Sequence, residues 1–231
     1  MALGFFGNGK GRDGSADAAQ ADLEMTRKLQ EVRGYWESLR RGRNLPERAD
    51  IDPRGISGAL DGAFLLERIA PGTGRLRIAG MTFTDLLGMD ARGMPLSAMF
   101  DPISRARLSI LMEQCFQRPN IQTLTLGSDS GLGRPPMKGK MILLPLSGDG
   151  SRGEMVMGCL VVSGEVGRAP RRLVLESAAT EPCTPTKPDL SSPTARVEAA
   201  LTVQAAKVQQ PFAVKPTAHS RPYLRLVDLD S

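Results

Sequence analysis

Histidine and cysteine are scarce in this chain. The one histidine among the 231 residues is His219, and the three cysteines are Cys115, Cys159 and Cys183. A zinc site needs clustered cysteine and histidine, so no metal site is predicted. Three widely spaced cysteines without a Cys-x-x-Cys pair indicate a reducing compartment. Without a histidine in the body of the chain, no nucleophile–base pair can be assembled, and we expect no enzymatic activity.

Long apolar runs and strong charge of one sign are also missing. No run approaches the roughly twenty apolar residues of a membrane span, and residues 1–11 lack the pattern of a secretory signal. A cytoplasmic protein is therefore expected. The net charge is +5 and is spread along the chain, so a nucleic-acid partner is not predicted. Aromatic residues make up only 4%, so the core must be built from aliphatic side chains and methionine.

A helix is predicted over residues 16–41, which contain no proline. Its apolar residues are spaced four, three, four and three apart, a seam typical of heptads. The seam consists of Met25, Leu29, Val32, Trp36 and Leu39. Two interpretations remain open and can coexist: the helix lies on its own domain, or it pairs with a copy of itself. Two heptads are too short for a coiled coil alone, so pairing would need help from a domain surface.

Residues 42–167 are predicted to form one α+β domain. Asp52-Pro53 starts a short helix, and Asp101-Pro102 starts a longer one that ends before Pro119. Between them, a helix over 82–87 is expected to begin with a capping box of Thr82 and Asp85 and to end at Gly88. The expected strands are 64–69, 75–79, 121–126, 138–146 and 155–163. The last two are apolar on both faces, so the sheet should be covered on both sides.

Both ends of the chain are expected to lack stable structure. Residues 1–15 are rich in glycine. Residues 168–231 are expected to be a largely disordered tail, because 168–220 hold seven of the 17 prolines and little that could build a core. Within this tail, residues 221–227 form a short alternating apolar segment. It could add as an edge strand to its own domain or to a partner.

Several short motifs carry a family resemblance. They are Tyr35-Trp36 with Ser38-Leu39-Arg40, Pro46-x-Arg48-x-x-Ile51-Asp52-Pro53, Phe64-Leu65-Leu66, and Arg77-Ile78-Ala79-Gly80 followed by Phe83, Leu87-Gly88 and Gly93. Over about residues 29–165 the chain resembles the stand-alone bacterial PAS-domain proteins of the alphaproteobacterial type. The resemblance implies a five-stranded antiparallel sheet of order 2-1-5-4-3 with helices on one face. The N-terminal amphipathic helix is the candidate cover for the other face. The resemblance also implies a sensory or protein-interaction role rather than catalysis.

No cofactor is predicted for this domain. A haem-binding PAS domain typically uses a histidine on the long helix, but His219 lies in the tail. A photoreceptor flavin needs a reactive cysteine that residues 88–100 do not offer. One ligand hypothesis survives, a small apolar molecule between the helices and the sheet. Its pocket would be lined by Phe83, Leu87, Leu108, Leu111, Met112, Cys115, Leu124 and Leu126. The alternative is a solid core.

The sequence therefore favours a non-enzymatic regulatory module of cytoplasmic signalling. We expect it to homodimerise through the N-terminal helix and the outer face of the sheet, and to contact a signalling protein that the sequence does not identify. The alternative is a sensor that binds a small hydrophobic ligand in the PAS cavity.

Overall fold

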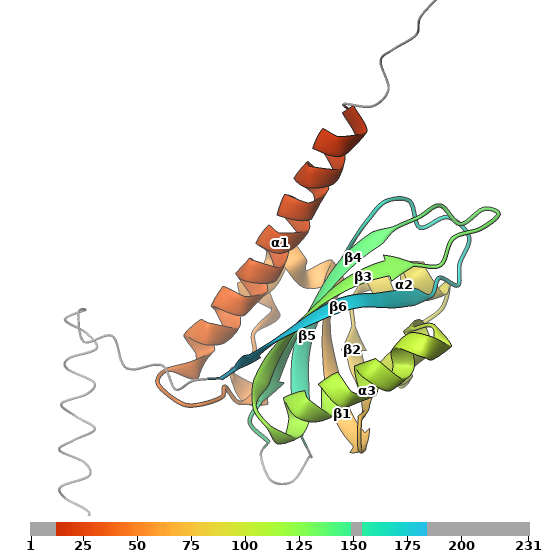
Figure 1. Cartoon of the computed structure of the whole chain (residues 1–231). Coiled ribbons are helices and arrows are strands. Elements are labelled where there is room, and N and C mark those ends of the chain that lie inside the picture. Colours follow the sequence, from red (N-terminus) through yellow and green to blue (C-terminus); the bar gives the residue numbers. More distant parts are fainter. Residues whose placement is uncertain (1–12, 149–153, 184–231) are drawn as a thin grey trace, which may run out of the picture. The chain divides into compact units, whose positions relative to one another are not determined.

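The structure, a computed structural model, describes residues 13–148 and 154–183 (Figure 1). Residues 1–12 and 184–231, which were predicted to be disordered, are outside the described part. The same holds for the apolar segment 221–227 and for His219. Residues 13–15 belong to the first helix, which begins three residues earlier than predicted. The helices are α1 (Asp13–Arg40), η1 (Arg48–Asp50), η2 (Pro53–Gly62), α2 (Met81–Leu87), η3 (Leu96–Met99) and α3 (Pro102–Gln117). The strands are β1 (Ala63–Ala70), β2 (Thr73–Ala79), β3 (Asn120–Ser128), β4 (Lys138–Leu146), β5 (Met155–Ser163) and β6 (Leu173–Pro182).

The sheet has six antiparallel strands in the order β2-β1-β5-β4-β3-β6. The predicted order of the first five is confirmed, but the prediction of five strands is wrong. The sixth strand, β6, lies in the stretch that was expected to be disordered. It pairs with β3 over the whole length of that strand, from Asn120–Pro182 to Ser128–Leu173. The strand is ordered by this ladder, which joins residues 45 to 62 positions apart in the sequence. Pairing at such a distance is not apparent in the local composition.

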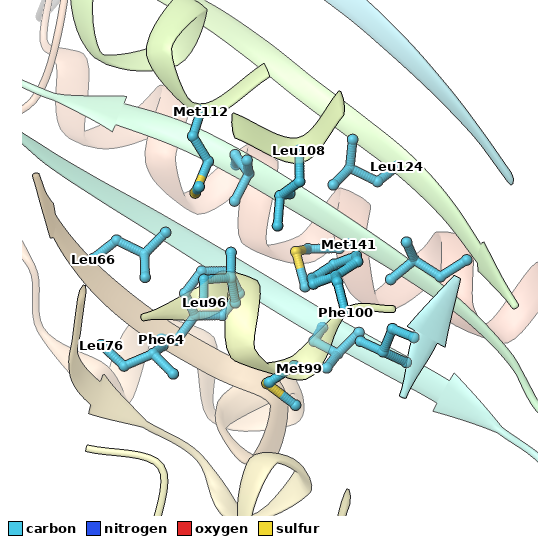
Figure 2. Close-up of a cluster of buried hydrophobic side chains, with 14 of the residues drawn as sticks. Phe64, Leu66, Leu76, Leu96, Met99, Phe100, Leu108, Met112, Leu124 and Met141 are labelled. Atoms are coloured by element: carbon cyan, nitrogen blue, oxygen red, sulfur yellow. The ribbon is translucent and has the colours of Figure 1, made fainter. Parts of the chain in front are cut away.

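The helices α2, η3 and α3 cover one face of the sheet, called here the helical face. Figure 2 shows the core between these helices and the sheet, which includes Phe64 and Leu66 of β1 and Leu108 and Met112 of α3. The rings of Phe64 and Phe83 meet edge to face at 5.2 Å between centroids. The two layers are held by this burial of apolar surface, the main favourable term in folding.

The helix α1 covers the opposite face, called here the outer face, as the pattern of the strands predicted. In Figure 1 it crosses the side of the sheet away from α3. Leu29, Val32 and Trp36 belong to a second buried cluster, with Leu144 of β4 and Met157 of β5. Side chains alternate along a strand, so β1 contributes to both clusters. Phe64 and Leu66 belong to the cluster on the helical face, and Ala63 and Leu65 belong to the cluster on the outer face.

The ends of the helices follow the predicted signals with one exception. Asp101 caps α3 by accepting from the backbone N–H of Ile103 at 2.9 Å, and Gly88 ends α2 with a positive φ of 72°. The predicted capping box is wrong, because α2 begins at Met81 after Gly80 and has no side-chain cap. A β-carbon at position 80 would lie 2.2 Å from the backbone oxygen of Asp61. Only glycine allows this close approach, which sets where the helix starts.

Candidate functional site

The five seam residues of α1 are all buried within the single chain. Met25, Leu29, Val32, Trp36 and Leu39 are only 3%, 4%, 0%, 0% and 9% exposed. The indole N–H of Trp36 donates to the backbone oxygen of Pro145 on β4 at 2.9 Å. The guanidinium of Arg40 lies 5.3 Å from the centre of the Trp36 ring, within the range of a cation–π contact. The first of the two open interpretations, a helix lying on its own domain, is what the structure shows.

Polar contacts add to the apolar seam on the side of β3, β4 and β6. Arg33 makes two hydrogen bonds to the carboxylate of Glu181 on β6, at 3.1 and 2.7 Å. Lys140 on β4 contacts the carboxylate of Asp22 and the hydroxyl of Thr26, both at 2.8 Å. The hydrogen bond from Arg33 is the main cause of the lowered pKa of Glu181. The sixth strand is therefore also part of the platform on which α1 lies.

Residues 41–62, called here the connector, link α1 to β1 and are tied to α1 through Tyr35. The Tyr35 hydroxyl donates to the backbone oxygen of Asp52 at 2.9 Å and accepts from the Asp52 N–H at 2.7 Å. The ring also lies against Gly55, where a β-carbon would come within 2.1 Å of it. Within the connector, Arg43 bonds the carboxylates of Glu47 and Asp50. These contacts hold η1 and η2 in a defined position beside the sheet.

A cavity of about 340 Å³ lies between the connector and the first two strands. Its wall is mainly apolar, and among the residues that the structure describes Arg48 is the one charged residue in it. The lining residues are Arg48, Ile51, Pro53, Ile56 and Leu60 of the connector, Ala63, Phe64 and Leu65 of β1, Ile78 and Ala79 of β2, Gly80, and Met157 of β5. Leu60 and Ile78 are 46% and 49% exposed, so apolar surface reaches solvent here.

The eight residues of the predicted PAS pocket lie together, as expected, but none of them lines this cavity. All belong to the buried cluster on the helical face, with exposures between 0% and 8%. Figure 2 shows Leu108, Met112 and Leu124 among the packed side chains. The sequence left two roles open for these residues, a pocket or a solid core. Their burial in one continuous cluster favours the core.

The buried cysteines behave as packing groups. Burial raises the pKa of the Cys115 thiol far above its usual value and that of Cys159 to about 12. A thiol with so high a pKa is a poor nucleophile, because the thiolate is the reactive form. Among residues 13–148 and 154–183, no three His, Cys, Asp or Glu side chains gather as a metal site would require. No helix in the same part of the chain has the length and apolar character needed to cross a bilayer.

Sequence reasoning missed the cavity, although it singled out several residues around it. Arg48, Ile51 and Pro53 of the Pro46–Pro53 motif line the cavity. Their common location depends on how the connector folds back onto β1 and β2. Spacing along the sequence does not encode that arrangement. The one signal in the sequence that pointed to the cavity was the Pro46–Pro53 motif, because three of its residues line the cavity.

Comparison with known protein families matches residues 25–161 to the PAS domain. The chain belongs to the PAS-domain family. The match starts at the first seam residue of α1 and ends within β5, so the PAS unit includes most of the docked helix, and β6 lies beyond the matched range. No curated protein matches the chain. Family membership indicates a signalling or sensory module. The alphaproteobacterial origin stays a prediction.

Proposed function

We propose that this PAS-domain protein is a non-enzymatic regulatory module of cytoplasmic signalling that acts through protein contacts of α1, first with a second copy of itself. The observation that carries the proposal is the position of α1. Its seam holds it on the outer face, while its first turns extend past the strands in Figure 1. A helix that is docked along its seam and exposed in its first turns is suited to receive a partner.

The free surface of α1 has a short apolar strip. Ala16, Ala19 and Leu23 are spaced three and four apart, and all three are exposed. Leu23 is 65% exposed. Residues at this spacing share one side of a helix. The strip is separate from the buried seam, so a second copy could pair there without displacing α1 from its own sheet.

The seam itself is a poorer candidate for the dimer contact that the sequence suggested. Its five side chains are already buried in their own chain, and Leu29, Val32 and Trp36 belong to the cluster on the outer face of the sheet. Pairing through them would first require α1 to leave the outer face and expose the cluster around Leu144 and Met157. A charged substitution at Leu29 or Val32 would therefore test the docking of α1 on its own sheet rather than association.

The proposal of a non-enzymatic role is supported by the protonation behaviour of the thiols and of a carboxylate in the domain. Burial raises the pKa of the thiols of Cys115 and Cys159. Glu113 bonds Arg68 and the backbone N–H of Gly72, contacts that lower the pKa of its carboxyl. Such a carboxylate stays ionised near neutral pH and suits a structural ion pair better than proton transfer. The alternative function, sensing of an apolar ligand by the eight core residues, has less support because those residues fill a continuous core.

The oligomeric state tests the proposal. Leu23→Glu places a charge on the exposed strip and should convert a wild-type dimer to a monomer at about 50 µM in sedimentation velocity. Ile103→Glu is the matched control, because Ile103 is an exposed isoleucine on α3 that is 89% accessible. It should leave the dimer unchanged. A monomeric wild-type protein would reject the homodimer, and a dimer that survives Leu23→Glu would place the contact elsewhere.

A further inference from the structure

We infer that the cavity beside the connector is a binding site for a free medium-chain fatty acid, with its alkyl chain among the isoleucines and its carboxylate at Arg48. The site goes beyond the proposed function, which needs no ligand. It also differs from the predicted pocket, since it contains none of the eight residues named for that pocket.

The size and lining of the cavity fit an alkyl chain. Its volume of about 340 Å³ lies at the lower end of small-molecule sites, which occupy about 300–1,000 Å³. A water molecule takes about 30 Å³ of liquid, and a methylene group is of similar size, so roughly ten such groups would fill the space. Ile51, Ile56 and Ile78 face it from three different elements or loops. An apolar wall of this kind offers few partners for water and favours a hydrocarbon.

The charge at the cavity indicates the head group. Arg48 is exposed, and within the described part of the chain it makes no ion pair. It contrasts with Arg43 of the same connector, which is engaged by Glu47 and Asp50. A guanidinium has a fork of donors that matches the two oxygens of a carboxylate. One free cation beside an apolar cavity is complementary to a molecule with one anionic end and one alkyl chain.

The walls of the cavity are held in place before any ligand arrives. Tyr35 fixes Asp52 next to Pro53, and the Asp52 side chain accepts from the N–H of Arg54 at 3.0 Å. The opposite wall is the β1–β2 hairpin, in which Leu65 pairs with Ile78. A site that is formed in advance loses less ordering entropy on binding than a mobile groove.

Methyl NMR of the full-length protein can locate the ligand. The chain has eight isoleucines, of which Ile51, Ile56 and Ile78 line the cavity. Titration of delipidated protein with decanoate below its micelle concentration should shift these three methyl signals in a saturable way. Ile103 and Ile110 on α3 should not move. Absence of saturable shifts up to 1 mM would overturn the proposal, and so would shifts confined to other isoleucines.

Two variants and a neutral ligand distinguish the contribution of the Arg48 charge to binding from the contribution of the apolar cavity. Arg48→Gln should weaken decanoate binding about tenfold and change decanol binding less than twofold, because only the carboxylate interacts with the guanidinium. Arg54→Gln is the control, an exposed arginine that does not line the cavity. Leu60→Trp should block both ligands by narrowing the opening. Equal effects of the two arginine variants would reject the head-group assignment. If decanoate binds only a truncated chain that lacks residues 184–231 and not the full-length protein, the occupant is the chain's own tail, and the fatty acid is rejected.

Discussion

At the scale of single residues, Arg171 shows how one buried charge can hold two loops together. Its side chain is 0% exposed. It donates to Asp129 Oδ1 at 3.1 Å, to the Ser128 hydroxyl at 2.7 Å and to the backbone oxygen of Pro135 at 2.7 Å, and it also bonds Val166. The guanidinium therefore joins the turn after β3, the entry to β4 and the segment between β5 and β6. A buried cation is tolerated only when its donors are satisfied in this way.

Replacement of Arg171 by methionine should lower the free energy of unfolding by about 3 kcal/mol, because it leaves buried acceptors without a donor. Arg171→Lys should recover little, since an ammonium group lacks the planar fork that reaches several acceptors at once. Urea denaturation monitored by circular dichroism measures both changes. Arg168→Met is the control, an exposed arginine nearby on the same segment. A loss below 0.5 kcal/mol in Arg171→Met would show that solvent satisfies the acceptors.

The residues that sequence reasoning identified correctly have a shared property. The seam of α1 and the stripe of α3 repeat with the helical period, so their burial can be predicted from local spacing. Arg171 and the cavity residues around Arg48 have no such period. Their roles arise from loops that meet only after the sheet has formed, and a single arginine in the sequence looks like any solvated charge.

At the scale of elements, β6 is the strand that the composition of its surroundings concealed. Its first residues, Leu173 and Leu175, are buried, but most of the remainder is exposed, as expected for the edge of a sheet. The other elements could be predicted because apolar runs and turn residues mark their bounds. An edge strand buries little, so its sequence carries a weak signal. Hydrogen bonding to β3 keeps β6 in a regular structure that its composition does not predict.

The contact of β6 with α1 should depend on pH. The hydrogen bond from Arg33 lowers the pKa of Glu181 in the folded chain, whereas an unfolded glutamate titrates near 4.3. Its contribution is therefore present above the unfolded pKa and is lost as the pH falls through the lower, folded value. Glu181→Gln should cost less than about 1 kcal/mol at pH 7, because Glu181 is 48% exposed and solvent screens the pair. The cost should be smaller at pH 3 than at pH 7, because the contribution of the ion pair decreases as the pH falls.

Urea unfolding of both proteins at the two pH values measures this difference. Glu176→Gln on the same strand is the control, because Glu176 takes part in no ion pair of its side chain within the described residues. It should change stability equally at both pH values. A pH-independent cost for Glu181→Gln would mean that packing, and not charge, accounts for the contact.

At the scale of the whole molecule, one sheet separates two hydrophobic cores that are formed by different helices. The core on the helical face includes side chains from α2, η3, α3 and all six strands, whereas the core on the outer face is closed by α1 and the connector. The sequence predicted both layers, since apolar strands with two buried faces need two covers. Because the two clusters lie on opposite faces, loss of α1 would expose the outer core and leave the core on the helical face covered.

This arrangement predicts that α1 can leave the sheet as a unit. Val32→Asp puts an unpaired charge at a site that is 0% exposed and should weaken docking by about 3 kcal/mol. Hydrogen exchange should then increase throughout α1, while α3 and β3 keep their protection. Trp36, the single tryptophan of the chain, should show red-shifted fluorescence as its indole meets water. Gln30→Asp, at an exposed position of the same helix, should change neither signal. Simultaneous loss of protection in α1, α3 and β3 would show instead that the two cores unfold together, and that α1 is a fixed wall rather than a releasable signalling element.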